Sequence, residues 1–286
     1  MTWEVVVLGS VGPYGAAMAT RSVGPLVRDW RVRRRRSQMD LAHDVGVSPR
    51  HLSFVETGRS RPSPELLLIL AERLEVPLRD RNLLLLAAGY APRYGETPLD
   101  AVAMTRARAA LQRMLDTHDP YPGVVIDRFW NVVLTNPAAG RLMQGLPLDL
   151  LGPPVNVFRV CLHPDGLARR TLNFPEWSAY LLGQLHRTAT ITGDPGLLEL
   201  IDEVTQYPNV AALDDWRRRA ASDEPALLIP LRLDIEGVEL SLFTTLTTFG
   251  TPLDVTLAEL AVELFFPADE ASDAVLRGGA PALPDT

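Results

Sequence analysis

The sequence of 286 residues contains no lysine, a single cysteine and no long apolar run. One cysteine, Cys161, excludes an internal disulfide and a cysteine-rich metal site, and we expect it to pack as a small buried side chain. No stretch approaches about 20 consecutive apolar residues, so we predict no membrane-spanning helix. The glycine-rich loops GxGxxG and GxxxxGK(S/T), which bind nucleotide phosphates, are also missing, and we predict no cofactor.

The first residues resemble a signal peptide only in part. Residues 4–18 are apolar and end in small residues, but Glu4 stands where a basic segment should precede them, and no arginine precedes Arg21. We therefore interpret residues 1–23 as a disordered extension, or as sequence upstream of a start at Met18. This interpretation predicts a cytoplasmic protein. The composition past about residue 270 predicts a second disordered segment, residues 271–286.

The positive charge is concentrated in one short segment. All 28 basic residues are arginines, and the formal net charge of the chain is −7. Residues 21–62 nevertheless carry ten arginines against Asp29, Asp40, Asp44 and Glu56. A compact basic segment on an acidic protein is typical of local contact with nucleic acid.

Residues 24–90 have the pattern of five short helices. Ser48 and Ser63 are each followed by proline, which is typical of a helix start, and Gly58 is typical of a helix end. Gly46-Val47-Ser48 forms a three-residue turn between two of these helices. Breakers then dominate residues 91–99, which we interpret as a linker.

The two helices around this turn have the spacing of a helix-turn-helix. Ala42 is small where the helices would cross, and Leu52 and Val55 would hold the second helix against the others. The second helix would enter the major groove of double-stranded DNA, where Arg50 can bind guanine bidentately. The residues predicted to contact DNA are Gln38, Ser48, Pro49, Arg50, His51, Ser53, Phe54, Arg59 and Arg61.

The pattern QxxLAxxxGVSxxxLSxVExGRxxP, from Gln38 to Pro62, resembles the xenobiotic-response-element family of helix-turn-helix domains, which includes phage repressors. The resemblance implies an all-α, lambda-repressor-like fold and a homodimer on a palindromic operator. It also implies phosphate contacts for Gln38 and Ser48 and base contacts for Arg50, His51 and Phe54. The sequence departs from the family at Pro49, where many members have a polar residue that can also contact DNA, so the resemblance does not fix which residue makes the first base contact.

The pattern from residue 100 to residue 270 predicts a separate mixed α/β domain. Alternating runs in residues 124–134 and 227–249 predict antiparallel strands, and residues 254–266 read as a helix or, in part, as a strand. The overall fold class is therefore α+β with two domains.

Several strings in the second domain resemble the MmyB-like ligand-binding domain. They include VVIDRFWNVVLTNPAAGRLM and LFTTLTTFGTPLDVTLAELAVELFFPADE. The resemblance implies a PAS-like fold, an antiparallel sheet with helices around an apolar cavity, and a small apolar effector such as a fatty acid. The residues that we expect to line the cavity are Trp130, Phe158, Trp177, Leu181 and Phe243.

The sequence leaves two other functions of the second domain open. The domain could only dimerise or bind another protein, or it could process its ligand as an enzyme. The second alternative lacks support because no nucleophile–base pair and no metal-ligand spacing is found. We therefore predict no catalytic residue.

Overall fold

The computed structural model describes residues 22–213 and 228–278 and divides into two compact units. Among the described residues, the first unit contains residues 22–98 together with Thr251–Ala258, and the second contains residues 99–213, 228–250 and 259–278. Each unit has its own hydrophobic core. Residues 1–21, with Met18 among them, and residues 279–286 lie outside the described residues, so the extension predicted at the N-terminus is not described.

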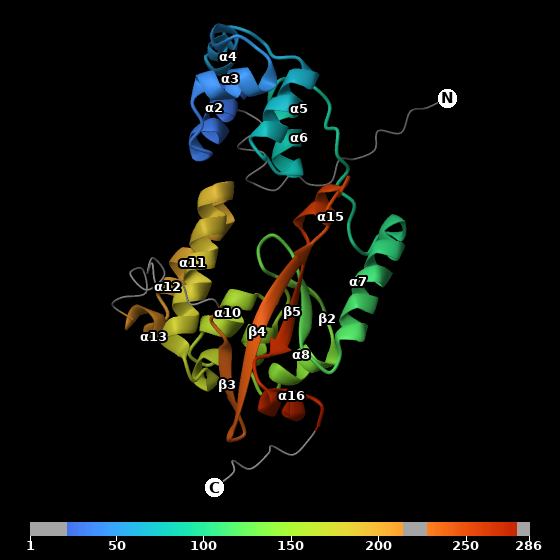
Figure 1. Ribbon diagram of the computed structural model, residues 1–286, viewed down its shortest axis with the longest axis vertical. Coiled ribbons are helices and arrows are strands. Elements are labelled where there is room, and N and C mark those ends of the chain that lie inside the picture. The colour runs from blue at the N-terminus through green and yellow to red at the C-terminus, as the bar shows by residue number, and fades with distance from the viewer. Residues whose placement is uncertain (1–21, 214–227, 279–286) are drawn as a thin grey trace. The chain divides into compact units, whose positions relative to one another are not determined.

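The described part of the first unit contains the five helices predicted from the sequence (Figure 1). They are α2 (Val23–Arg33), α3 (Gln38–Val45), α4 (Pro49–Glu56), α5 (Pro64–Arg73) and α6 (Leu78–Ala87). Serine caps start three of them, because the hydroxyls of Ser37, Ser48 and Ser63 accept the backbone N–H three residues further on, at 3.1–3.2 Å. Each cap satisfies one of the N–H groups that a helix start leaves unpaired.

A glycine allows α2 to approach α4 closely. A Cβ added to Gly24 would lie 2.5 Å from the backbone oxygen of Val55 and 2.7 Å from that of Glu56. Backbone atoms cannot yield as a flexible side chain can, so any other residue at position 24 would push the two helices apart. Leu26, Val27 and Trp30 on α2 are buried beside this contact.

The second unit is built on a five-stranded antiparallel sheet with the strand order β2-β1-β5-β4-β3. The strands are β1 (Gly123–Ile126), β2 (Val132–Thr135), β3 (Leu231–Ile235), β4 (Val238–Thr248) and β5 (Ala261–Pro267). The sheet confirms the mixed α/β fold predicted for this domain. It also settles the open assignment of residues 254–266, which form a short helix, α15 (Val255–Glu259), and then β5.

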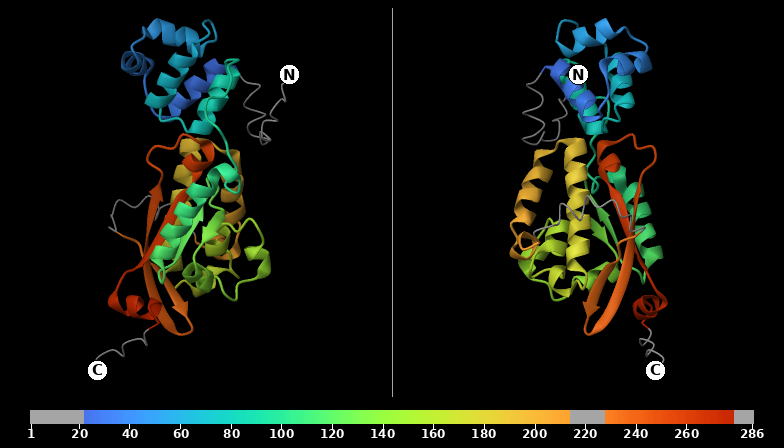
Figure 2. Two further views of the ribbon diagram at one scale, coloured as in Figure 1. Left: turned by 90° about the vertical axis from the view of Figure 1, so that its right-hand side faces the viewer. Right: turned by 60° about the vertical axis from the view of Figure 1, so that its left-hand side comes forward.

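Helices cover both faces of the sheet. The helical elements in the described residues of this unit are η1 (Val102–Met104), α7 (Thr105–His118), α8 (Pro137–Leu142), α9 (Leu148–Leu151), α10 (Val157–Leu162), η2 (Leu167–Arg170), α11 (Phe174–Thr192), α12 (Pro195–Thr205), α13 (Pro208–Ala211) and α16 (Glu270–Leu276). Figure 2 shows α7 on one face and α11 with α12 on the other. Successive residues of β5 point to opposite faces, so Leu264 packs toward Leu115 of α7 beside Gly123, while Glu263 faces the α11 side.

Two predicted boundaries differ from the structure. The segment expected to be disordered from residue 271 begins with α16, because Asp269 caps this helix and the buried Ser272 hydroxyl accepts the backbone N–H of Ser241 at 2.9 Å. The linker of residues 91–99 is held within the first unit: Thr97 donates twice to the carboxylate of Asp254, and Val255 donates its N–H to the oxygen of Gly95 at 2.8 Å.

Candidate DNA-binding surface and ligand cavity

The turn between α3 and α4 sets the angle of a helix-turn-helix. Gly46 ends α3 with a φ of 74°, a left-handed conformation that glycine adopts at little cost. The N–H of Val47 returns to the oxygen of Ala42 at 3.0 Å, and Ser48 then caps α4. Ala42 and Leu52 are almost completely buried, which leaves the opposite side of α4 outward.

The outward side of α4 carries the predicted base-reading residues. Ser48, Pro49 and Arg50 are exposed, whereas His51, Ser53 and Phe54 are half-buried. The guanidinium groups of Arg50 and Arg59 lie 5.3 and 5.9 Å from the centre of the Phe54 ring. These distances permit cation–π attraction, which holds both arginines beside the same aromatic ring.

A buried ionic network joins α2, α3 and α4, and no pattern in the sequence indicates it. Glu56 at the end of α4 is 4% exposed and accepts two hydrogen bonds from the Arg31 guanidinium, at 2.6 and 2.9 Å. The Gln38 side chain donates to the same carboxylate at 2.7 Å. The hydrogen bonds that Arg31 donates to Glu56 raise the pKa of Arg31 above its ordinary value. Arg31 thus has a structural partner, and the network fixes the side chain of Gln38 at the start of α3.

Arg61 lies apart from the residues around Phe54. Its guanidinium is 4.5 Å from the centre of the Tyr90 ring and donates to the backbone oxygen of Gly89 at 3.3 Å. The Tyr90 hydroxyl in turn donates to the oxygen of Pro62. The side chain of Arg61 remains exposed, so a DNA phosphate could still approach it.

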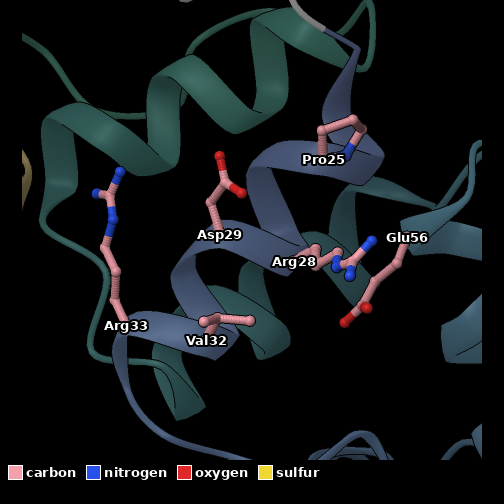
Figure 3. Close-up of a pocket in the computed structure, with 6 residues that line it drawn as sticks. All are labelled: Pro25, Arg28, Asp29, Val32, Arg33 and Glu56. Atoms are coloured by element: carbon pink, nitrogen blue, oxygen red, sulfur yellow. The ribbon is translucent and has the colours of Figure 1, made fainter.

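A shallow depression of about 480 Å³ lies along α2 (Figure 3). Arg28 and Glu56 stand at one end of it and Arg33 at the other, with Asp29 between them. Because charged side chains supply much of this wall, the depression does not suit an apolar effector.

An apolar cavity lies in the second unit, between the sheet and helices α8, α10 and α11. Its volume is about 70 Å³, and its wall is formed mainly by aliphatic side chains such as Val124, Leu142 and Val157. Cys161 also lines it, and burial raises the pKa of this thiol to about 12, with a further contribution from the charge of Glu263. A thiol with this pKa remains protonated at neutral pH and is a poor nucleophile.

Two described residues of the cavity wall carry nitrogen or oxygen atoms in their side chains, Glu263 and Trp177. They are 8% and 3% exposed, and both Oε2 of Glu263 and Nε1 of Trp177 are buried without a hydrogen-bond partner. Burial raises the pKa of Glu263 to about 7, although a hydrogen bond from the Thr244 side chain favours the charged form. The sequence pattern does not single out Glu263, because this residue lies within an apolar run.

The five residues predicted to line the cavity separate in the structure. Trp177 and Leu181 on α11 belong to its wall. Trp130 and Phe158 instead pack against each other, with ring centres 5.0 Å apart, in the adjoining core. Phe243 stacks on Phe266 at 5.4 Å, on the face toward α7, because Leu242 and Thr244 occupy the α11 face of this strand. Trp130, Phe158 and Phe243 therefore do not belong to the described wall of this cavity, and their contact with a ligand stays a prediction.

Neither a metal site nor a membrane span was found within residues 22–213 and 228–278. No cluster of three or more histidine, cysteine or acidic side chains in these ranges could hold a metal ion. No helix in the same ranges is long and apolar enough to cross a membrane.

Comparison with known families agrees with both units. A family model described as the MmyB-like transcription regulator ligand binding domain matches residues 107–278, and a helix-turn-helix model matches residues 27–80. None of the curated proteins matches the chain. Together the two matches define a DNA-binding transcription regulator that carries a ligand-binding domain. Within this class, the chain belongs to the MmyB-like transcription regulators.

Proposed function

We propose that this regulator binds a palindromic operator as a homodimer in the cytoplasm, and that a small apolar ligand, with fatty-acyl compounds as the expected class, changes its affinity for DNA. The observation that supports DNA reading best is the outward face of α4, where Arg50 and Arg59 flank Phe54. In this proposal Arg50, His51 and Phe54 contact bases in the major groove. Gln38, Ser48, Arg59 and Arg61 contact phosphates, and Pro49 and Ser53 contact the groove wall.

Substituting Arg50 by alanine should change sequence preference as well as affinity. Bidentate recognition of one guanine contributes about 1–3 kcal/mol to discrimination in each half-site, so Arg50→Ala should weaken binding by roughly 5- to 150-fold per half-site and relax one base position in each half. Selection of bound DNA from a random pool, followed by sequencing, measures this effect. It should also show two half-sites about one helical turn apart for a dimer.

Arg61→Ala is the matched control, because a lost phosphate contact should weaken all sequences alike. An unchanged preferred operator in Arg50→Ala would mean that α4 does not read bases as proposed. A selected site without two-fold symmetry would count against the dimer.

The apolar cavity supports control by a ligand. Its described wall contains no basic residue and is mostly aliphatic, and burial of a methylene group is worth about 0.8 kcal/mol. Its volume of about 70 Å³ is smaller than the roughly 150 Å³ that accommodates benzene in a known cavity. An acyl chain would therefore enlarge it, and Met143 in the wall has the flexible side chain that such adaptation uses.

Fatty acids and alcohols of graded chain length should raise the melting temperature and change operator affinity in parallel. A ligand that favours one conformation by about 1–3 kcal/mol would change DNA affinity by roughly 5- to 150-fold. Calorimetry and DNA-binding titrations on the full chain measure both effects. Leu181→Phe, which fills the cavity, should diminish them, whereas Leu172→Phe at an exposed position should not. If no compound changes either quantity, the domain has another role, such as dimerisation.

We assign the protein no catalytic activity. Its one cysteine, Cys161, has a thiol whose pKa burial raises to about 12. The high pKa keeps the thiol protonated and disfavours covalent catalysis at neutral pH.

A further inference from the structure

The cavity of the second unit combines an apolar wall with two polar atoms that have no partner in the protein. Nε1 of Trp177 is a hydrogen-bond donor on α11, and Oε2 of Glu263 is an acceptor, when ionised, on β5. Both residues belong to the wall of the same cavity and are more than nine-tenths buried. A buried polar atom without a partner is costly, and native proteins leave few of them.

The surroundings of Glu263 do not supply the missing partner. The Thr244 side chain hydrogen-bonds to the carboxyl group, yet Oε2 stays unpaired. Cys161 and Tyr180 also lie near enough for the charge of Glu263 to affect them, and both have a raised pKa. Arg187 is exposed and interacts electrostatically with Tyr180. No described residue in the cavity wall is basic, so nothing there could neutralise a second negative charge.

The geometry points to an effector with an apolar body and a neutral head group that both donates and accepts hydrogen bonds, such as a hydroxyl or a primary amide. The head would donate to Glu263 and accept from Trp177, which satisfies both orphaned atoms. Burial raises the pKa of Glu263 to about 7, so at pH 8 this group is mostly ionised. A carboxylate head would then meet its negative charge in an apolar wall, where like charges repel strongly. This inference rests on the proposed ligand control and names the head group that the same cavity selects.

Binding of chain-matched compounds to the full protein tests the inference. We would titrate hexyl and dodecyl series, each with an alcohol, a primary amide, a methyl ether and a carboxylate, at pH 8 by calorimetry. The alcohol and the amide should bind at least tenfold more tightly than the ether, which cannot donate, and than the carboxylate. The ether controls for chain burial because it keeps the acceptor and loses the donor.

Variants identify the residues responsible. Glu263→Gln retains an acceptor and removes the charge, so it should bind the alcohol within about threefold of the wild type and the carboxylate about tenfold more tightly than the wild type does. Trp177→Phe removes the N–H donor. It should weaken binding of the alcohol and of the ether alike, so the ratio of their affinities should stay the same. Glu199→Gln, at an exposed position on α12, is the control and should change nothing.

The outcomes distinguish a failure of head-group selection from a failure of the proposed ligand control. A carboxylate that binds as tightly as the alcohol, with no gain in Glu263→Gln, would overturn head-group selection and leave ligand control intact. Failure of every compound to bind at either chain length would overturn ligand control, and head-group selection with it. The inference would also be overturned if the alcohol binds tightly and neither Glu263→Gln nor Trp177→Phe changes its affinity or that of the carboxylate.

Discussion

Arg31→Ala should lower the free energy of unfolding of the first unit by about 3–5 kcal/mol, because it leaves the Glu56 carboxylate buried with Gln38 as its remaining side-chain partner. The side chains of Arg31 and Glu56 are only 12% and 1% exposed, so the carboxylate of Glu56 relies on its protein partners more than on solvent. Denaturant titration with hydrogen exchange in residues 22–58 measures the effect on α2, α3 and α4. Arg73→Ala, at an exposed position on α5, should change the free energy by less than about 0.5 kcal/mol.

A double substitution separates the loss of the pair from the loss of its packing. Replacing both partners of a buried ion pair by apolar residues of similar volume is often neutral or stabilising, so Arg31→Met with Glu56→Leu should regain most of the stability. The double variant should still lose DNA affinity if Gln38 needs Glu56 for its orientation. If Arg31→Ala lowers the free energy of unfolding by less than about 1 kcal/mol, the network contributes little to stability.

Glu263→Gln should stabilise the protein relative to the wild type at pH 8 by about 3 kcal/mol and have little effect at pH 4.5. Burial raises the pKa of Glu263 from its ordinary 4.5 to about 7, so the folded state binds a proton that the unfolded state releases between these values. Wild-type stability is therefore complete below the unfolded pKa and falls as the pH rises toward 7. Glutamine cannot titrate, so the difference between the two proteins should grow over this range.

The titratable groups near Glu263 do not change their charge over the pH range of this comparison. Burial raises the pKa of Cys161 to about 12 and also raises the pKa of Tyr180 above its ordinary 10, so both stay neutral from pH 4.5 to 8. Denaturant titrations at the two pH values measure the difference, and Glu199→Gln should shift stability by less than about 0.5 kcal/mol at both. An equal effect of Glu263→Gln at pH 4.5 and 8 would contradict the assignment.

The sequence predicts much of the first unit because its local rules are strong. Serine caps, Pro49 and the left-handed Gly46 mark where helices start and end within a few residues. Local patterns cannot predict the Arg31–Glu56 pair, because its members are 25 residues apart. Arg31 also belongs to a run of basic residues, which gives it no distinguishing feature. The role of Gly24 cannot be predicted from local patterns either, since only the packed structure brings the backbone of α4 against it.

In the second unit, the sequence predicts the strands better than the cavity. Alternation along β4 identifies two faces but cannot say which face will be covered by α11. The sequence therefore does not show that Phe243 lies on the α7 face and Thr244 on the α11 face. Aromatic size alone does not distinguish a cavity wall from a solid core, and Trp130 and Phe158 pack together in the core beside the cavity. Glu263 could be found only by asking which charged residue interrupts an otherwise apolar strand.

The ties of Thr97 and Gly95 to Asp254 and Val255 bear on how such regulators can be recombined. The first unit is discontinuous in the chain, since residues 251–258 belong to it although they are encoded more than 150 positions after residue 98. A fragment that ends at residue 98 would lack the carboxylate that binds Thr97 and the N–H group that binds Gly95. A chimaera that exchanges the ligand-binding domain must therefore take the join between β4 and β5 from the same parent as the helix-turn-helix.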